Sequence, residues 1–275
     1  MKEERTAVDD YSYLMQGLMQ VPTTSSLLVS SSRYLNDARI RDWVATHLLR
    51  RNGPDAPTPS DPMPLVLALR EVQDIGHINE LFAAERAKNA ALDAWFREGF
   101  ISSFRREDLK GYPPGTCGGI FYKQLVDNDL QVDIVPPYKP QNDYQYFFLR
   151  AGQTHDLEHI LGGGGFDFIG ELVPYYMRLT NLFVHLSPEL AGELSVFSIL
   201  SSTRIITRAV LHYPQTWLTV VDALERGAQV GRESAPLYSL RFEDVFELTP
   251  EEARLKCGIR GVREADTATA SAQWC

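Results

Sequence analysis

Apolar residues recur at the three- and four-residue spacing of amphipathic helices along most of the chain. The spacing is clear within residues 1–52 and returns between Leu65 and Phe104. Further along, a capping residue before a proline predicts helix starts at Ser187-Pro188 and Thr249-Pro250, and Tyr213-Pro214 separates two helices. The pattern predicts an all-α protein, a multi-helix bundle.

Three segments interrupt the helical pattern. Gly53–Pro64 holds five prolines, which are too many for a helix, and it is too short for a domain linker. Gly111–Gly119 is a cluster of turn residues, and residues 264–275, rich in alanine and threonine, are expected to form a disordered tail. We therefore expect a single domain over residues 1–275.

One predicted helix places two histidines on the same apolar stripe. His155 and His159 are four residues apart, so they stand about one turn above each other on one helix face. At about 100° per residue they share a narrow stripe that faces the core. The stripe consists of Tyr144, Phe148, Ala151, His155 and His159.

Carboxylates accompany this histidine pair at three positions. Asp156 and Glu158 flank the stripe at about 60° on either side, and helix geometry does not choose between them as metal ligands. The glycines of Gly162–Gly165 must end the helix and turn the chain, and a second helix then brings back Glu171. The sequence predicts a metal site between two helices joined by a glycine-rich turn.

Two imidazoles with one or two carboxylates form a mixed nitrogen and oxygen donor set. Such a set suits a divalent metal, Zn, Fe(II), Co or Mn, and leaves coordination positions open for water, substrate or dioxygen. The simpler alternative is a hydrogen-bonded pair of core histidines. It is disfavoured because two imidazoles and three nearby carboxylates are costly to bury without a cation.

The composition limits the kinds of partner that the protein is expected to bind and the cellular compartment in which it is expected to work. The formal charge of -9, without any block of lysine or arginine, argues against nucleic acid and gives no electrostatic attraction to anionic lipid. Cys117, Cys257 and Cys275 are odd in number and lack Cys-x-x-Cys spacing, which favours inert thiols in a reducing compartment. Without a run of about 18 apolar residues or a signal-peptide pattern, we expect a cytoplasmic protein that binds a small molecule.

Around the histidine pair, the chain resembles the Coq4 family of ubiquinone biosynthesis proteins, as a divergent member of bacterial type. The family signature is His-Asp-x-x-His followed by eleven residues and a Glu, which His155, Asp156, His159 and Glu171 fit without a gap. The likeness covers about residues 110–260. Further matches lie at Pro114-Gly115-Thr116, Tyr122, Tyr146–Arg150, Gly227, Leu237, Phe242-Glu243, Pro250–Arg254 and Gly258-Ile259.

The resemblance implies an all-helical fold and peripheral contact with a membrane, which we place at the inner membrane face. The partners we expect include other biosynthetic enzymes and a second copy of the chain in a homodimer. The resemblance implies that His155, Asp156, His159 and Glu171 hold the metal. It also implies a metal-dependent oxidative decarboxylation, in which a hydroxyl replaces the carboxyl group at ring carbon 1 of a hydroxybenzoate-type precursor. The expected partner is an aromatic quinone precursor, with or without a prenyl tail.

The chain departs from the family pattern beside the predicted metal site. Gly152-Gln153 replaces the family's Arg-Glu, and Tyr175 replaces a lysine commonly found four residues after the motif glutamate. Pro174 stands where the family continues a helix, so the backbone beyond Glu171 is either kinked or begins a new helix there. The first two changes remove charged side chains from the surroundings of the predicted metal site. The identity of the substrate is therefore not fixed by the resemblance.

We single out Asp156, Glu158 and Arg178 for catalysis. Arg178 also stands with Arg150 and Tyr175 as a substrate-binding candidate, because it would lie about two helical turns, on the order of 10 Å, beyond the glutamate ligand. The alternative for Arg178 is a solvated or ion-paired side chain. Arg150 either anchors Asp156 or a substrate anion, or forms a structural salt bridge.

Several classes of function compete for this sequence. A metal-dependent oxidative decarboxylase is favoured, and the alternative is a non-catalytic scaffold that binds a lipid or quinone precursor around a structural ion. A hydrolase akin to the His-Glu-x-x-His metalloproteases is disfavoured, because Asp156 is one methylene shorter than the usual general base. A di-iron bundle is disfavoured because the chain lacks repeated Glu-x-x-His pairs.

Overall fold

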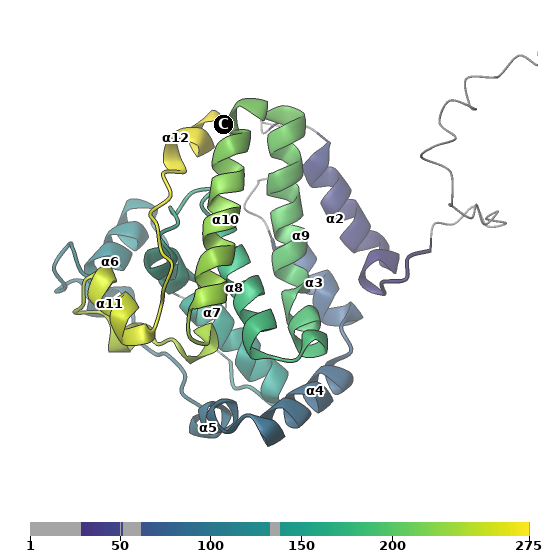
Figure 1. The fold of residues 1–275 in the computed structure, drawn as a ribbon, viewed down its shortest axis with the longest axis horizontal. Helices are drawn as coiled ribbons and strands as arrows, with labels where there is room; N and C mark the ends of the chain where they lie inside the picture. The colour runs from purple at the N-terminus through teal and green to yellow at the C-terminus, as the bar shows by residue number, and fades with distance from the viewer. Residues whose placement is uncertain (1–28, 50, 52–61, 133–137, 275) are drawn as a thin grey trace, which may run out of the picture.

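The computed structural model describes residues 29–49, 51, 62–132 and 138–274. Within these residues the protein is all-helical and contains no β-strand, which confirms the predicted all-α class (Figure 1). The single domain over residues 1–275 stays a prediction. The α-helices are α2 (Ala38–Leu48), α3 (Met63–Val72), α4 (Ile75–Lys88), α5 (Ala90–Glu98), α6 (Cys117–Asp127), α7 (Asp143–Gly162), α8 (Leu172–His185), α9 (Pro188–His212), α10 (Trp217–Glu233), α11 (Pro250–Cys257) and α12 (Ala268–Ser271).

Capping residues divide the chain more finely than apolar periodicity does. Asp74 and Asn89 each accept a hydrogen bond from a backbone N–H and so begin α4 and α5. Gly99, with a φ of 62°, ends α5, and residues 99–105 are not helical. The stretch predicted as helical between Leu65 and Phe104 is therefore three helices and an extended segment.

Two predicted loops end earlier than expected. Gly53–Pro64 lies mostly outside the described residues, and its last member, Pro64, stands in the first turn of α3, where a proline is tolerated. The turn cluster Gly111–Gly119 gives way to α6 after Thr116, which caps that helix. A Cβ atom on Gly119 would lie 1.9 Å from a backbone oxygen of the preceding turn, so this glycine permits close packing inside a helix.

The remaining helix boundaries agree with the sequence. The helix expected within residues 1–52 is represented by α2, and residues 1–28 lie outside the described part of the chain. Helices begin after Ser187 and Thr249 as predicted, the second through a full capping box. Tyr213-Pro214 separates α9 from α10, also as predicted.

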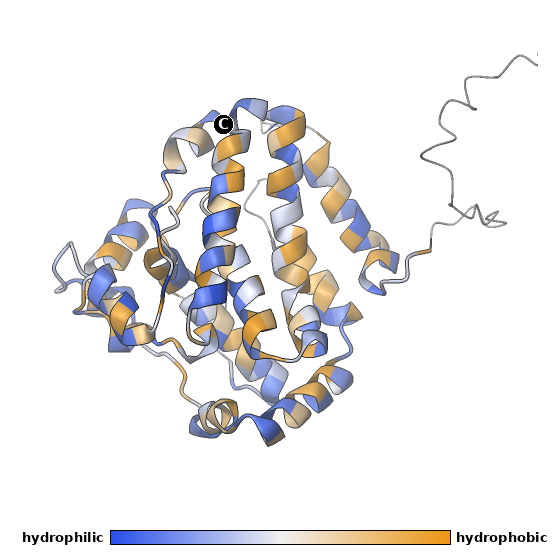
Figure 2. Cartoon of the chain, viewed as in Figure 1, coloured by the Kyte–Doolittle hydropathy of each residue, from blue (hydrophilic) through white to orange (hydrophobic). Residues whose placement is uncertain are grey.

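Helix α8 runs between α7, α9 and α10 and contacts all three (Figure 1). Hydrophobic and hydrophilic residues alternate along these helices, as amphipathic packing requires (Figure 2). The contact between α7 and α8 carries the site described below, because the histidine pair belongs to α7 and Glu171 directly precedes α8.

Two glycines of α10 allow it to lie against α8. A Cβ atom on Gly227 would stand 2.5 Å from the carbonyl oxygen of Val173, and one on Gly231 would stand 2.3 Å from that of Met177. Both approaches are shorter than any side chain allows, so the two helix backbones meet at these positions.

We expect Gly231→Ala to lower the free energy of unfolding by about 1–3 kcal/mol, because the added methyl forces α10 away from the α8 backbone. Urea denaturation followed by circular dichroism measures the change. Gly192→Ala in α9 is the matched control: a Cβ there meets nothing within 4 Å, so a gain of about 1 kcal/mol in helix propensity is expected. Equal effects of the two substitutions would contradict the close packing of α8 and α10.

Helix α9 is, among the described residues, the one helix long and apolar enough to cross a membrane by length and composition. It packs against α2, α3, α4, α8 and α10. Its buried positions include Arg204, Arg208 and four serines. One face of α9 is therefore covered by its neighbours, and 44% of its apolar stretch is buried.

The prediction of a disordered tail at residues 264–275 is wrong for the described residues. The segment forms α12 and the 3-10 helix η7 (Ala272–Trp274), and only 1% of Trp274 is exposed. The Trp274 ring stacks on Tyr213 with centroids 4.4 Å apart, and its Nε1–H donates to Thr216 Oγ1 at 3.1 Å. The alanine-rich composition suggested a disordered end, but the buried packing of the Trp274 ring stabilises an ordered one.

Candidate metal centre

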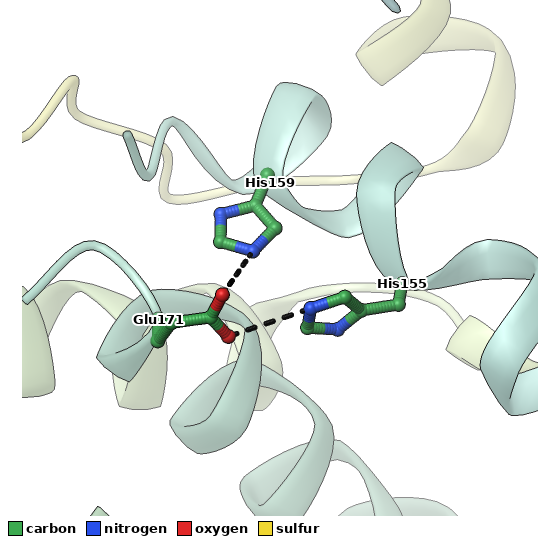
Figure 3. Close-up of side chains that lie close together, drawn as sticks. All are labelled: His155, His159 and Glu171. Carbon is green, nitrogen blue, oxygen red and sulfur yellow. Dashed lines mark ion pairs between the residues drawn. The ribbon is translucent and has the colours of Figure 1, made fainter. Parts of the chain in front are cut away.

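His155, His159 and Glu171 converge at the junction of α7 and α8. The Glu171 carboxylate points between the two imidazole rings, as Figure 3 shows. Its Oε2 lies 3.4 Å from His155 Nε2 and its Oε1 lies 3.6 Å from His159 Nε2. One ligand atom from each of the three residues lies within 4.8 Å of the others, so the group could hold a metal ion.

The glycine-rich turn brings Glu171 back to the histidines. Helix α7 ends at Gly162, and Gly163 adopts the left-handed conformation with a φ of 77°. The backbone N–H of Glu171 then donates to Asp167 O at 3.1 Å, and α8 begins at Leu172. Pro174 lies in the first turn of α8, so a new helix begins there, one of the two outcomes that this proline allowed.

The ring of His159 is held in an orientation that suits metal binding. Its Nδ1 lies 3.0 Å from the carbonyl oxygen of Gly165, and because a carbonyl only accepts, Nδ1 carries the proton. In the neutral form, which is the form that binds a metal, the lone pair of the ring is therefore on Nε2, the atom that faces Glu171. The Phe166 ring stacks on this imidazole at 4.9 Å and fixes its plane.

Electrostatics favours a charged carboxylate between the rings. Burial opposes ionisation of Glu171, but the nearby His159 and His155 outweigh it and hold the pKa of Glu171 well below its usual value. Burial also disfavours the charged form of His155, yet Glu171 raises the pKa of that imidazole. A cation at this position would replace the imidazole proton as the partner of the carboxylate.

The spacing of the group is close to that required by a first-row divalent ion. Ligand atoms about 2.0–2.2 Å from a tetrahedral metal stand roughly 3.3–3.6 Å apart. Both nitrogen–oxygen distances above are in this range, but each involves a different oxygen of Glu171, and ligand atoms taken one per residue lie up to 4.8 Å apart, so the side chains would move closer together around an ion. The His159 side chain is 1% exposed, whereas the side chains of His155 and Glu171 are 19% and 28% exposed. His155 and Glu171 are therefore only partly shielded from solvent, whereas His159 is fully enclosed.

Asp156 does not belong to this group. It is half-buried, and burial raises the pKa of its carboxyl although His155 and His159 act in the opposite direction. Its predicted roles as metal ligand and catalytic residue stay predictions. A carboxyl with a raised pKa beside the group is suited to hold a proton.

Glu158, which is buried, forms an ion pair with Arg178, whose side chain is 20% exposed. Arg178 Nη2 lies 2.6 Å from Glu158 Oε1, and its Nε donates to Oε2 at 3.1 Å. The same guanidinium donates to the carbonyl of Ala151, and Thr154 Oγ1 donates to the carboxylate. The pair ties α7 to α8, so a substrate anion at Arg178 would compete with Glu158.

Arg150 and Tyr175 lie in well-defined surroundings. Arg150, 1% exposed, donates to Ser102 Oγ, to the Gln153 side chain and to the Leu240 carbonyl. No ion pair joins it to a carboxylate among the described residues. The Tyr175 ring lies 6.4 Å from that of His155, and burial raises the pKa of its hydroxyl, so it is a neutral neighbour of the group.

Sequence reasoning missed two parts of the site. The carbonyl of Gly165 was not recognised as the partner of His159, since any residue provides a carbonyl. Asp167 was also missed; its carboxylate accepts from Gly170 N–H at 3.0 Å inside the turn. Its signal was present as an Asp three residues before a Gly, the pattern of a side-chain-capped turn.

Comparison with known proteins identifies the family. The model of the family described as coenzyme Q (ubiquinone) biosynthesis protein Coq4 matches residues 101–262, more than half of the chain. The chain therefore belongs to the Coq4 family, which takes part in ubiquinone biosynthesis. No curated protein matches the sequence.

The fold is also found among solved structures. An example is a 2.85 Å crystal structure of a protein from Nostoc punctiforme PCC 73102 whose name refers to ubiquinone biosynthesis. The TM-score is 0.54 at 17% identity, over 82% of this chain and 98% of that one. At this identity the likeness supports the fold alone.

Proposed function

We propose that the protein is a metal-dependent enzyme of ubiquinone or related biosynthesis that oxidatively decarboxylates a hydroxybenzoate-type or prenylated quinone precursor. The observation that carries the proposal is the group of His155, His159 and Glu171, which could hold one divalent ion with three protein ligands and so leaves a coordination position for a further ligand. A structural ion is usually closed off by four protein ligands, whereas an open position is typical of catalytic sites.

In the proposed reaction the bond between the ring and its carboxyl carbon breaks, and carbon dioxide leaves. One atom of dioxygen forms the new ring hydroxyl, and the other is reduced to water by two electrons and two protons from an external reductant. The bound ion would act as a Lewis acid that holds the phenolate or carboxylate and stabilises developing charge. His155, His159 and Glu171 would hold it, and Asp156 would hold a proton beside it.

Turnover and metal content test the proposal together. Protein purified without added metal is analysed for its elements, then incubated with a carboxylated hydroquinone precursor, dioxygen and ascorbate. We expect about one equivalent of metal and a product in which hydroxyl replaces carboxyl, with one oxygen atom from labelled dioxygen. Chelation should remove the activity, and Zn, Fe(II), Co or Mn added singly should identify the metal that restores it.

The same experiment separates the enzyme from the alternative function. Bound metal with an unchanged acid under dioxygen would favour a scaffold that binds the precursor for other enzymes. Under either function, the cytoplasm with peripheral contact at the inner membrane face is the proposed location. A homodimer and association with other biosynthetic enzymes remain part of the proposal.

A further inference from the structure

The segment after residue 262, which we call the strap (residues 263–274), lies beyond the part of the chain matched by the family model. It runs from the region of α11 alongside α10 to α12, as Figure 1 shows in yellow. On this path the backbone N–H of Ala265 donates to Gly163 O at 3.0 Å. The strap therefore meets the glycine-rich turn where that turn leaves α7.

Two hydroxyl groups of the strap bind the turn. Thr267 Oγ1 donates to Asp167 Oδ2 at 2.6 Å, and the Ser271 hydroxyl donates to Asp167 Oδ1. Ser271 Oγ also accepts from the backbone N–H of Ile169 at 2.9 Å. Thr267 and Ser271 are both buried, so water does not compete freely for these hydrogen bonds.

These contacts reach both sides of the metal group. Asp167 O accepts from the backbone N–H of Glu171, so fixing Asp167 fixes the start of α8 and the Glu171 carboxylate. A Cβ on Gly165 would lie 2.8 Å from Thr267 Oγ1, so the strap also packs on the residue whose carbonyl orients His159. One short segment thus supports two of the three candidate ligands.

The far end of the strap is also held by residues outside the turn. Trp274 stacks on Tyr213 and contacts Phe168 with centroids 4.9 Å apart. Its indole N–H is hydrogen-bonded to Thr216 at the junction of α9 and α10. Because both ends of the strap are attached, Thr267 and Ser271 are held in place against Asp167.

We propose that the strap is a positioning device for the metal centre, with Thr267, Ser271 and Asp167 as its positioning residues. The proposal rests on the proposed function, since it requires the group to bind a metal. Groups that orient ligands typically contribute about 10- to 100-fold to metal affinity when they are removed one at a time. The strap would hold Glu171 and the Gly165 carbonyl in the arrangement that binds the ion.

Cobalt(II) titration of the full chain tests the strap, because bound Co²⁺ absorbs visible light in a way that reports its ligand geometry. We expect Thr267→Val to raise the Kd for Co²⁺ by about 10- to 100-fold and to change the visible spectrum. Thr267→Ser, which keeps the hydroxyl, should restore both. Thr269→Val is the matched control, because Thr269 is exposed on α12, two residues after Thr267, which is the N-cap residue of that helix.

The outcomes distinguish a strap that positions the metal ligands from one that only stabilises the fold by packing. If Thr267→Val lowers the melting temperature of the metal-free protein while its folded form keeps the wild-type Kd and spectrum, the strap is only structural. Should that variant fail to fold, Ser271→Ala gives the same comparison through the Ile169 and Asp167 contacts. Wild-type protein that binds no Co²⁺ would overturn the metal centre itself and the strap proposal with it.

Discussion

Replacing His159 by alanine is expected to reduce metal affinity by more than about 100-fold, since a direct ligand contributes more than the groups that orient it. His159 is the most buried member of the group, and its Nε2 is already aimed at Glu171. With two candidate ligands left, no stable site remains. Elemental analysis of the purified variant and Co²⁺ titration measure the loss, and decarboxylation should fall with it.

His77→Ala provides the matched control for a histidine outside the group. His77 lies on α4, where its ring pairs with Glu80 and Glu189. This variant should keep about one equivalent of metal and its turnover. Glu171→Gln, nearly isosteric with the wild type, should lose metal as His159→Ala does while disturbing the core less. A His159→Ala protein that still binds a full equivalent would refute the proposed centre.

The sequence was sufficient to predict the helices that carry the group. The four-residue spacing of His155 and His159 and the glycines after Gly162 are local signals, because helix geometry and left-handed caps depend on neighbouring residues alone. The return of Glu171 was also predictable, since the turn between the two helices is short. The structure brings these three side chains together as the spacing suggests, although metal binding itself stays a proposal.

Features that depend on distant contacts were not predictable. The composition around Ser271 suggested fraying, because nothing local shows that Trp274 reaches Tyr213, about 60 residues away in sequence, and outweighs the entropy of an ordered terminus. The close approach of Gly231 to α8 is a property of the packed pair of helices. A glycine in a helix looks only unfavourable until its neighbour is known.

The pairing of Glu158 with Arg178 was missed for a related reason. Each residue was assessed on its own helix, and each was a candidate for chemistry at the metal. The angle at which α7 and α8 meet turns them toward each other, which no periodicity within one helix encodes. The ion pair is the simplest account of why the Glu158 carboxylate, 1% exposed, is buried as a charge, while Arg178 stays 20% exposed.

Replacing Arg178 by methionine is expected to lower the free energy of unfolding by about 3–5 kcal/mol, because it leaves the Glu158 carboxylate buried with one hydroxyl partner. Urea denaturation measures the change. Arg97→Met removes an exposed arginine from its pair with Asp93 one helical turn away, and Asp93 keeps its second partner Arg86, so the cost should be no more than about 0.5 kcal/mol. Similar losses of stability in the two variants would show that the Glu158–Arg178 pair contributes no more than a solvent-exposed ion pair.

The double variant Glu158→Met with Arg178→Met separates the structural role of the pair from the predicted substrate clamp. An apolar pair of similar volume satisfies the α7–α8 contact without an unpaired charge, so most of the lost stability should return. Metal affinity should then equal that of the wild type, since neither residue belongs to the group of His155, His159 and Glu171. If precursor affinity also stays unchanged, Arg178 ties two helices together and does not hold substrate; a selective rise in KM with stability restored would assign it to the clamp.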